Sequence, residues 1–438
     1  MQHSRALIVA GLAALIAASV PFPAGGQDMH FNRSSFELSV GQSLDDEGNV
    51  SLVISMSVPY RQIVFLKRGE RYEARFRIYV SVKDGKGKQV RGEVWEEKVV
   101  AGNYEETKSA SGVASARRVF PVEPGEYDVE VNVEVIDTSL EYTKKKTIEI
   151  LGRESGKFRI ADPVFFSSTA AIHDERPSSG QVTVNPCAEL DESGFKPNNH
   201  AIYADFNIWP RIVCNLMAPS ETIENEAYTV SSRVRDRRGN DILYNRTYLM
   251  ASGNGYQRLC MDINVDDLPI GDYEISVAVE LPRTDCKAVS KGRFTVLLNR
   301  GVLERYFGET MEILSLFAEK DDLDELANST RENRVAAWNR FWREKDPNPS
   351  SQVNEGLGEF LQRLEHVLRS YSSFSPGWRT DRGKVYMRYG RPDDVVDRQG
   401  RAYGTNYQLW YYYSRGMLYI FEDMLGTGDY RLLETRMI

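Results

Sequence analysis

The side chains best suited to chemistry in this sequence are acidic residues grouped near its C-terminal end. They are Asp381, Asp393, Asp394, Glu422 and Asp423. Two carboxylates held about 5–9.5 Å apart can supply the acid and base of glycoside hydrolysis. Nothing in the spacing of these five selects one pair, and acids on turns are commonly solvated. A hydrolase acting on carbohydrate or peptide is therefore one interpretation, and solvated acids are the other.

Histidine, the commonest general base, is scarce near these acids. The five histidines are His3, His30, His173, His200 and His366, of which only His366 falls in the same region. The sequence contains no Gly-x-Ser-x-Gly, His-Glu-x-x-His or phosphate-loop motif. A Ser/His/Asp or Cys/His mechanism would lack its base there. We therefore assign no catalytic residue, and we expect neither a cofactor nor a metal site.

Cysteine could serve either structure or metal binding. The four cysteines, Cys187, Cys214, Cys260 and Cys286, all fall within one hundred residues. No Cys-x-x-Cys pair occurs, which disfavours a metal site. In an exported chain the four would form two disulfides, in one of three connectivities that the sequence does not distinguish. We predict that all four are oxidised, with buried thiols as the alternative.

A glycine-framed motif lies among the acids, and further motifs surround it. Gly377-Trp378-Arg379-Thr380-Asp381 is preceded by Phe341-Trp342, Asp346-Pro347 and Asn354-Glu355, and followed by Trp410-Tyr411 and Phe421-x-Asp423. In this order, from about residue 300 onward, the pattern resembles the bacterial GWxTD-domain proteins. The residues that carry the resemblance are Gly377, Trp378, Thr380, Asp381, Arg382, Gly383, Tyr389, Gly390, Pro392, Asp393, Trp410, Tyr411, Phe421 and Asp423. The family implies no established activity.

The motif itself is open to two interpretations. Asp and Thr side chains bond to nearby backbone N–H groups in turns, and glycine accepts dihedrals that other residues avoid. We predict a structural corner that joins a helix to a strand over 384–389, with Trp378 buried against the helices. The alternative is a ligand-binding or catalytic site.

The aromatic residues that follow are also open to two interpretations. Tyr407–Tyr413 and Met417–Glu422 are predicted strands with apolar residues on both faces. A strand of this kind needs cover on both sides. Helices can cover one face, and the second face is then either covered by another part of the chain or free to bind a protein or sugar.

The chain of 438 residues, with a net charge of −8, is long enough for several domains and lacks the basic balance of a nucleic-acid binder. Arg5, the apolar run from Ala6 to Val20 and the small residues Ala24-Gly25-Gly26 predict a signal peptide over 1–26. No other apolar run approaches the length of a membrane span. We expect export to the periplasm or the extracellular space.

Two regions share the same turn signals between predicted strands. Asp84-x-x-Gly87 and Pro124-Gly125-Glu126-Tyr127 are echoed by Asp236-x-x-Gly239 and Pro269-Ile270-Gly271-Asp272-Tyr273. Ordered landmarks at similar spacing predict two tandem immunoglobulin-like β-sandwiches, over 27–155 and 156–298. Chance recurrence of common hairpin turns is the alternative.

Apolar residues at helical spacing replace this pattern after Asn299. Helices are predicted over 303–319, 331–345 and 353–371, followed by four short strands over 384–389, 407–413, 417–422 and 430–433. The expected architecture is therefore multidomain β plus α+β, with a helical segment and a small α+β domain over 299–438. We expect a non-enzymatic interaction or structural protein of the cell envelope or exterior, whose partner is a protein or envelope component. The alternative is a hydrolase that uses the C-terminal carboxylates.

Overall fold

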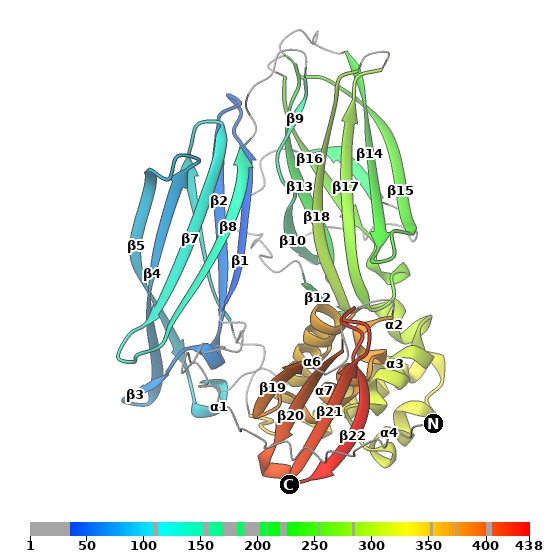
Figure 1. Ribbon diagram of the computed structural model, residues 1–438. Helices are drawn as coiled ribbons and strands as arrows, with labels where there is room; N and C mark the ends of the chain where they lie inside the picture. Colours follow the sequence, from blue (N-terminus) through cyan, green and yellow to red (C-terminus); the bar gives the residue numbers. More distant parts are fainter. Residues whose placement is uncertain are drawn as a thin grey trace, which may run out of the picture. The chain divides into compact units, whose positions relative to one another are not determined.

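Residues 36–150 form two antiparallel sheets around one apolar core in the computed structural model (Figure 1). The first sheet contains β1 (Glu37–Leu44), β2 (Val50–Pro59) and β6 (Val113–Pro121); the second contains β3 (Leu66–Arg68), β4 (Arg71–Asp84), β5 (Gln89–Ala101), β7 (Gly125–Val135) and β8 (Glu141–Ile150). Short helices η1 (Tyr60–Gln62) and α1 (Tyr104–Thr107) lie between strands. The structure describes residues 36–107, 113–150, 152, 157–169, 182–187, 202–206, 208–219, 226–252, 255–282, 285–350, 354–372, 375–399 and 405–438. The predicted signal peptide lies outside these residues.

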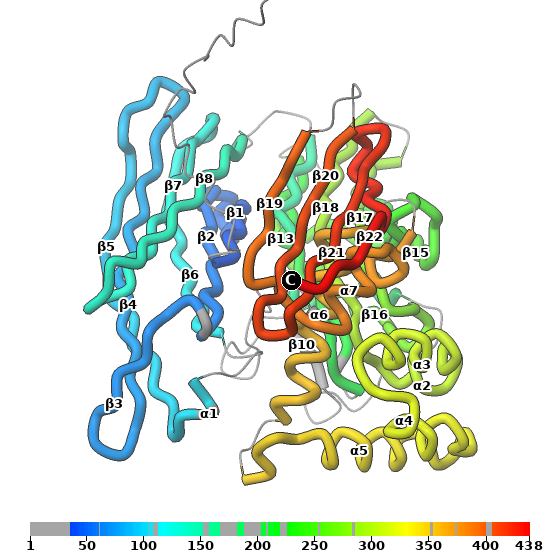
Figure 2. Tube along the Cα trace, turned by 60° about the horizontal axis from the view of Figure 1, so that its bottom comes forward, coloured from blue at the N-terminus to red at the C-terminus, as the bar shows by residue number. Residues whose placement is uncertain are grey.

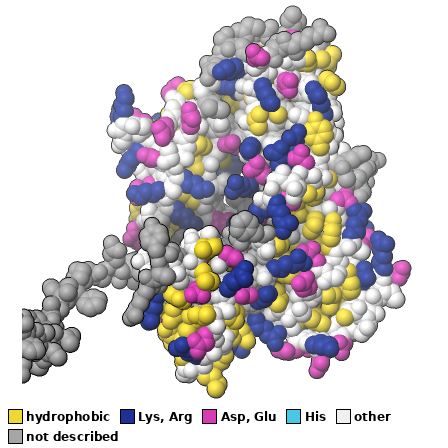
Figure 3. All heavy atoms as spheres, turned by 45° about the vertical axis from the view of Figure 1, so that its right-hand side comes forward, with side chains coloured by type: hydrophobic (Ala, Val, Ile, Leu, Met, Phe, Trp, Pro, Cys, Tyr) yellow, Lys and Arg dark blue, Asp and Glu magenta, His cyan; other side chains and the backbone are white. Residues whose placement is uncertain are grey.

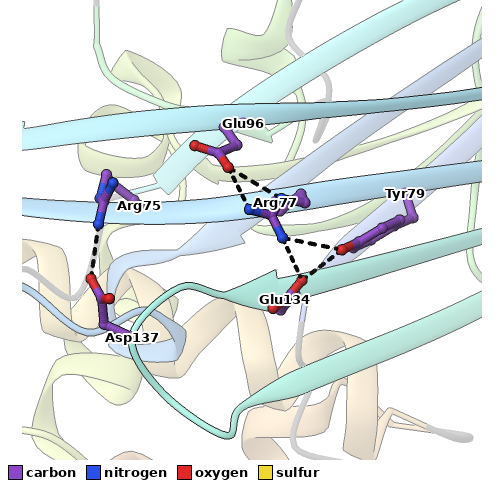
Figure 4. A network of polar contacts seen from close by, with 6 residues as sticks. All are labelled: Arg75, Arg77, Tyr79, Glu96, Glu134 and Asp137. Carbon is purple, nitrogen blue, oxygen red and sulfur yellow. Dashed lines mark hydrogen bonds and ion pairs between the residues drawn. The ribbon is translucent and has the colours of Figure 1, made fainter.

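Strand β7 shows how alternation in the sequence sets the two faces. Val129, Val131 and Val133 are fully buried, whereas the polar residues between them, Glu130 and Asn132, point away from the core. On the outer face, Arg77 bonds Glu96 on β5 (Nη2–Oε1 2.6 Å) and Glu134 on β7 (3.4 Å) (Figure 4). These charged pairs are solvent-exposed, so this face is a solvated surface that links neighbouring strands.

Residues 159–298 form a second pair of sheets around a second core. One sheet contains β9 (Arg159–Ile160), β10 (Val164–Thr169), β11 (Val182–Pro186), β13 (Ile208–Met217) and β16 (Tyr256–Ile263); the other contains β12 (Ile202–Ala204), β14 (Ala227–Asp236), β15 (Asp241–Met250), β17 (Gly271–Glu280) and β18 (Lys287–Leu298). Helix η2 (Val265–Asp267) precedes β17. The strand pairs are antiparallel except for β12 with β18. β10 and β11 come from a stretch rich in Pro, Gly, Ser and Asn, and both are strands of the first of these sheets.

The two pairs of sheets repeat the same strand order. β5-β4-β7-β8 in the first corresponds to β15-β14-β17-β18 in the second. In the β4–β5 turn Asp84 Oδ1 accepts the Lys86 and Lys88 N–H groups, and Asp236 Oδ1 makes the same two bonds in the β14–β15 turn. Each turn has a glycine with positive φ, Gly87 at 79° and Gly239 at 86°. The repeated turn signals therefore have the same geometry.

A tyrosine at the start of the third strand in each order extends the repeat. The Tyr127 hydroxyl donates to the Glu123 carbonyl oxygen (2.7 Å), and Tyr273 donates in the same way to Pro269 (2.7 Å). Both acceptors lie four residues upstream of the tyrosine. Each bond fixes the corner that leads into the strand.

Residues 300–389 are helical, and a small antiparallel sheet follows (Figure 2). The helices are α2 (Arg300–Glu304), α3 (Phe307–Ser315), α4 (Lys320–Ala327), η3 (Arg331–Asn333), α5 (Arg334–Glu344), α6 (Glu355–Tyr371), η4 (Gly377–Arg379) and α7 (Asp381–Tyr389). The sheet order is β19 (Asp394–Gln399), β20 (Asn406–Tyr412), β21 (Met417–Asp423) and β22 (Arg431–Met437), with η5 (Tyr413–Arg415) between β20 and β21. A mostly β protein with a helical segment and a small C-terminal sheet is thus confirmed. Among the described residues, no helix has the length and apolar character needed to cross a bilayer.

The prediction of a strand over 384–389 is wrong, because these residues belong to helix α7. Val385, Tyr386 and Met387 are buried in succession, a pattern that fits a helix packed on two sides and not an alternating strand. β-branched and aromatic residues gave the segment its strand-like composition. The first strand of the sheet is β19, ten residues later than predicted.

Of the four cysteines predicted to be oxidised, the structure joins two in a disulfide. Cys187 is bonded to Cys260, with Cα atoms 5.6 Å apart. Cys214 is fully buried in the second core, and burial, together with the nearby Asp162 carboxylate, raises the pKa of its thiol. Cys286 is buried in the same core and is not part of this disulfide.

Peptide mapping of the denatured but unreduced chain tests this arrangement. We expect a disulfide-linked pair of peptides containing Cys187 and Cys260, and an alkylated Cys214, because burial keeps that thiol from oxidants until the chain unfolds. Alkylation of native protein serves as the control and should leave Cys214 unmodified. A linked Cys214–Cys286 pair would contradict the structure.

Candidate functional site

The signature motif begins where η4 touches the end of α6 without any side chain between the two backbones. A Cβ atom on Gly377 would lie 1.6 Å from the Val367 carbonyl oxygen, so only glycine fits. Gly383 on α7 is similarly crowded, because a Cβ there would lie 1.8 Å from the Gly377 carbonyl oxygen. The Ser372 hydroxyl accepts the Gly377 N–H (2.7 Å) and fixes the turn. Three helical pieces therefore meet through backbone contact.

Thr380 begins helix α7. Its hydroxyl oxygen accepts the Gly383 N–H (3.1 Å) as an N-cap and donates to the Gly377 carbonyl (2.7 Å). Asp381 follows at the first helical position, where the helix dipole favours a negative charge. The Thr-Asp pair is therefore the start of a helix, and the predicted corner joins α6 to α7 and not to a strand.

Trp378 anchors this corner in the apolar core. Its side chain is 1% exposed and packs in the cluster formed by the helices and the sheet. The Arg379 guanidinium lies over its ring at 4.5 Å and bonds Glu312 on α3 (3.1 Å). Burial of the indole is as the sequence predicted, and the ring lies inside the protein.

Arg382 lies on the next turn, between aromatic rings. Its guanidinium lies 4.1 Å from the centre of the Tyr430 ring and 4.9 Å from that of Tyr371, and it donates to the Gly428 carbonyl (2.9 Å) and the Gln408 side chain (3.4 Å). Burial lowers the pKa of this guanidinium. The Gln408 oxygen also accepts the Trp410 indole N–H (2.8 Å), so one network links α7, β20 and the β21–β22 loop.

Asp423 fixes that same loop from the other side. It is 2% exposed, and its carboxylate accepts N–H groups of Leu425 (3.3 Å), Thr427 (3.1 Å) and Gly428 (2.7 Å). Asp381 Oδ2 accepts the Leu432 N–H (2.9 Å) where β22 begins. The polar side chains of the signature therefore converge on the loop over 424–430 and the start of β22.

The remaining acidic candidates have separate partners. Asp393 accepts the Tyr413 N–H (2.7 Å), Asp394 accepts the Val395 N–H (2.9 Å) and Glu422 accepts the Tyr407 hydroxyl (2.7 Å). None of these hydrogen bonds joins two of the five carboxylates that suggested acid/base chemistry. The described residues also contain no cluster of three or more His, Cys, Asp or Glu side chains able to hold a metal.

The other signature residues support the sheet on α7. Gly390 ends α7 with φ of 75°, and its carbonyl accepts the Tyr412 hydroxyl (2.8 Å). Pro392 and Asp393 lead into β19, and Tyr389 packs on Tyr412 and Tyr419. The aromatic residues buried on the helix side are Trp410, Tyr412, Tyr419 and Phe421. On the opposite face Tyr411 stacks on Tyr413, which is 59% exposed. The helices therefore cover one face of the aromatic strands, and the other face combines buried Leu409 and Leu418 with exposed Tyr413.

Sequence reasoning missed Gln408, Tyr371 and Tyr430 as partners of Arg382. Tyr430 was placed on a strand, but the alternation of apolar residues gives no sign of a buried cation beneath it. It also missed the loop itself. Met424 and Leu425, its first two residues, are 69% and 80% exposed, although Asp423 and Arg382 hydrogen-bond to the backbone of the same loop. The signal available in the sequence was the apolar pair Met424-Leu425 directly after Asp423 of the signature.

Comparison with known proteins assigns this part of the chain. Residues 305–423 match the GWxTD domain family, which confirms the resemblance drawn from the signature residues. A search of curated protein sequences found no match. One solved structure, titled "Complete structure of manganese lipoxygenase of Gaeumannomyces graminis and partial structure of zonadhesin of Komagataella pastoris", aligns with 59% of this chain and 93% of its own, at 10% identity and a TM-score of 0.19. A score this low carries no argument about fold or function.

The glycine contacts lead to a matched pair of substitutions. Gly377→Ala should lower the free energy of unfolding by about 1–3 kcal/mol or more, because its Cβ would overlap a backbone oxygen that cannot move cheaply. Gly308→Ala on α3 is the control: its Cβ meets nothing within 4 Å, so it should be neutral or stabilise by about 0.5–1 kcal/mol. Chemical denaturation of both variants provides the measurement. Equal stability of the two would rule out the close approach.

Proposed function

We propose that the chain is an exported, non-enzymatic interaction protein whose GWxTD domain presents the β21–β22 loop to a protein partner. One observation carries the proposal: Asp381, Arg382 and Asp423 all bond to this loop or to the start of β22. A loop fixed in this way displays Met424 and Leu425 to solvent at little cost in conformational entropy on binding. Exposed methionine and leucine side chains on such a loop favour an apolar pocket on a protein.

The carboxylates support this proposal over the hydrolase. A catalytic acid and base need a shared space for the substrate and access to its reacting atoms. Asp423 instead is almost fully buried and bonded to three backbone N–H groups, and Asp381 is bonded to Leu432. These are the bonds of residues that hold a backbone shape.

The two pairs of sheets fit immunoglobulin-like sandwiches that act as spacers or docking modules. Their support is the shared strand order and the tyrosine that bonds back to a carbonyl at the corner before a central strand. A tyrosine corner at this place is a hallmark of immunoglobulin-like sandwiches. In tandem such sandwiches would extend the GWxTD domain away from an attachment point.

Photo-crosslinking in the native host tests the role of the loop. A photoreactive residue at Leu425 should capture a discrete protein, because the side chain is directed to the partner. Placed at Tyr248 on β15, which is 66% exposed, the same probe is the control and should not capture that protein. Asp423→Asn in the Leu425 probe chain should weaken capture several-fold by loosening the loop, with the circular dichroism spectrum unchanged. The same products from both probes, or hydrolysis of envelope polymer that Asp381→Asn abolishes, would defeat the proposal.

Export is the second part of the proposal. Its support is the signal-peptide pattern over 1–26 and the Cys187–Cys260 disulfide, a bond typical of oxidising compartments. Intact-mass measurement of the chain from its native host should give a mature protein that begins near Gln27, in the periplasm or medium. A cytoplasmic chain that retains residues 1–26 would refute it.

A further inference from the structure

Strand β22 is an edge of the small sheet with an unusual surface. It is the last strand in the order β19-β20-β21-β22, and all seven of its residues are exposed. Leu433 is 56% exposed and Met437 88% exposed. Figure 3 shows hydrophobic side chains gathered in the lower part of the view, where Figure 1 places this sheet. An exposed apolar edge is a template for pairing with another strand.

The backbone of β22 has donors on both sides. The Ile438 N–H donates to the Gly416 carbonyl on the β21 side (2.9 Å). N–H groups alternate in direction along a strand, so those of Thr435 and Met437 point to the open edge. The register with β21 shifts between Glu434 and Leu432, so the Leu432 N–H also lies away from β21, and Asp381 accepts it. Pairing at this edge is therefore available after Leu432.

The side chains of β22 are complementary to themselves in one antiparallel register. If Thr435 lies opposite Thr435 of a second copy, each Glu434 lies opposite an Arg436. Each Leu433, at the point where the register of β22 with β21 shifts, then comes near a Met437. Glu434 and Arg436 already bond within the strand (2.7 and 2.6 Å) on the face opposite the helices, so pairing would form a cluster of four charges of alternating sign. Opposite charges and apolar pairs across strands stabilise a sheet.

Neighbouring registers lack this match. Opposed residues in an antiparallel pair share a face, so the symmetric alternatives are centred on a residue and its own copy. Centring on Glu434 places two like charges opposite each other, and centring on Arg436 does the same. Centring on Leu433 places Glu434 opposite Leu432. Only the register centred on Thr435 opposes unlike charges and apolar pairs together.

From this complementarity we propose that the chain forms a symmetric dimer through antiparallel pairing of β22 with β22 of a second copy. The two sheets of four strands then join into one continuous sheet of eight. We assign a second copy of the chain to this edge because the charged and apolar residues of β22 match those of another β22 in the register centred on Thr435. This inference is independent of what the β21–β22 loop binds.

Charge reversal across the axis tests the dimer in the full chain. At roughly 100 µM, where small interfaces still associate, sedimentation should show a dimer. Glu434→Arg and Arg436→Glu should each raise the dimer Kd by about tenfold, because each places like charges opposite each other twice. An equimolar mixture of the two variants should restore a one-to-one heterodimer, since each charge then meets its opposite.

The mixture separates contacts between chains from those within a chain. Within each variant chain, residues 434 and 436 carry like charges whether or not the other variant is present, so recovery in the mixture reports only pairing between chains. Thr435→Cys provides a second measurement: mild oxidation should link it to its own copy, whereas Leu433→Cys should not link, because its copy lies about 13 Å along the strand. A monomeric parent chain at this concentration, no recovery in the mixture, or equal linking of the two cysteine variants would overturn the proposal.

Discussion

The signature motif depends on direct contact between backbones at Gly377 and Gly383. Because neither position has room for a Cβ atom, α6, η4 and α7 stack closer than side chains would allow. That stacking sends Trp378 into the core and brings the first turn of α7 beneath β22. With one more atom at either glycine, Asp381 and Arg382 would no longer reach the loop. The glycines of the signature thus set the close packing of the helices, and this packing places the polar residues of the signature where they can form their hydrogen bonds.

The buried polar residues beside this contact explain why the signature contains both charges. Asp423 is nearly inaccessible to solvent, and burying a carboxylate is costly unless its oxygens are hydrogen-bonded. Three backbone N–H groups supply these hydrogen bonds. The Arg382 guanidinium, which lies between the rings of Tyr371 and Tyr430, donates to the Gly428 carbonyl of the same loop. If either Asp423 or Arg382 is removed, the loop loses the hydrogen bonds that this residue makes to its backbone. A two-residue turn would be enough to connect β21 and β22 as a simple hairpin, without buried charges to support it. Under the proposed function, these bonds fix the surface that the loop displays.

The sequence predicts local structure well where one residue type has one physical consequence. Asp84-x-x-Gly87 and Asp236-x-x-Gly239 predict their hairpins because aspartate bonds and positive-φ glycine act within five residues. The 384–389 segment fails because its residues favour a strand, whereas capping by Thr380 and burial on two sides make it a helix. The sequence does not determine the cysteine connectivity, because pairing depends on which strands adjoin, and Cys260 lies on β16 opposite the end of β11. The contact of Arg382 with Gly428 spans 46 residues and has no local signature at all.

Edges govern how such a β-rich chain avoids unwanted association. β5 and β15 lie at corresponding edges of the two repeated sheets, and both mix exposed apolar residues such as Val94 and Tyr248 with charged neighbours. Charged side chains on an edge strand discourage pairing with unrelated strands. On β22 the charges discriminate between partner strands. Glu434 and Arg436 disfavour registers that place like charges opposite them and favour an antiparallel strand that places Arg opposite Glu434 and Glu opposite Arg436. Asp381 adds a second restriction because it accepts the N–H of Leu432, the second residue of the strand. The residue that begins helix α7 therefore also sets where an edge contact can begin.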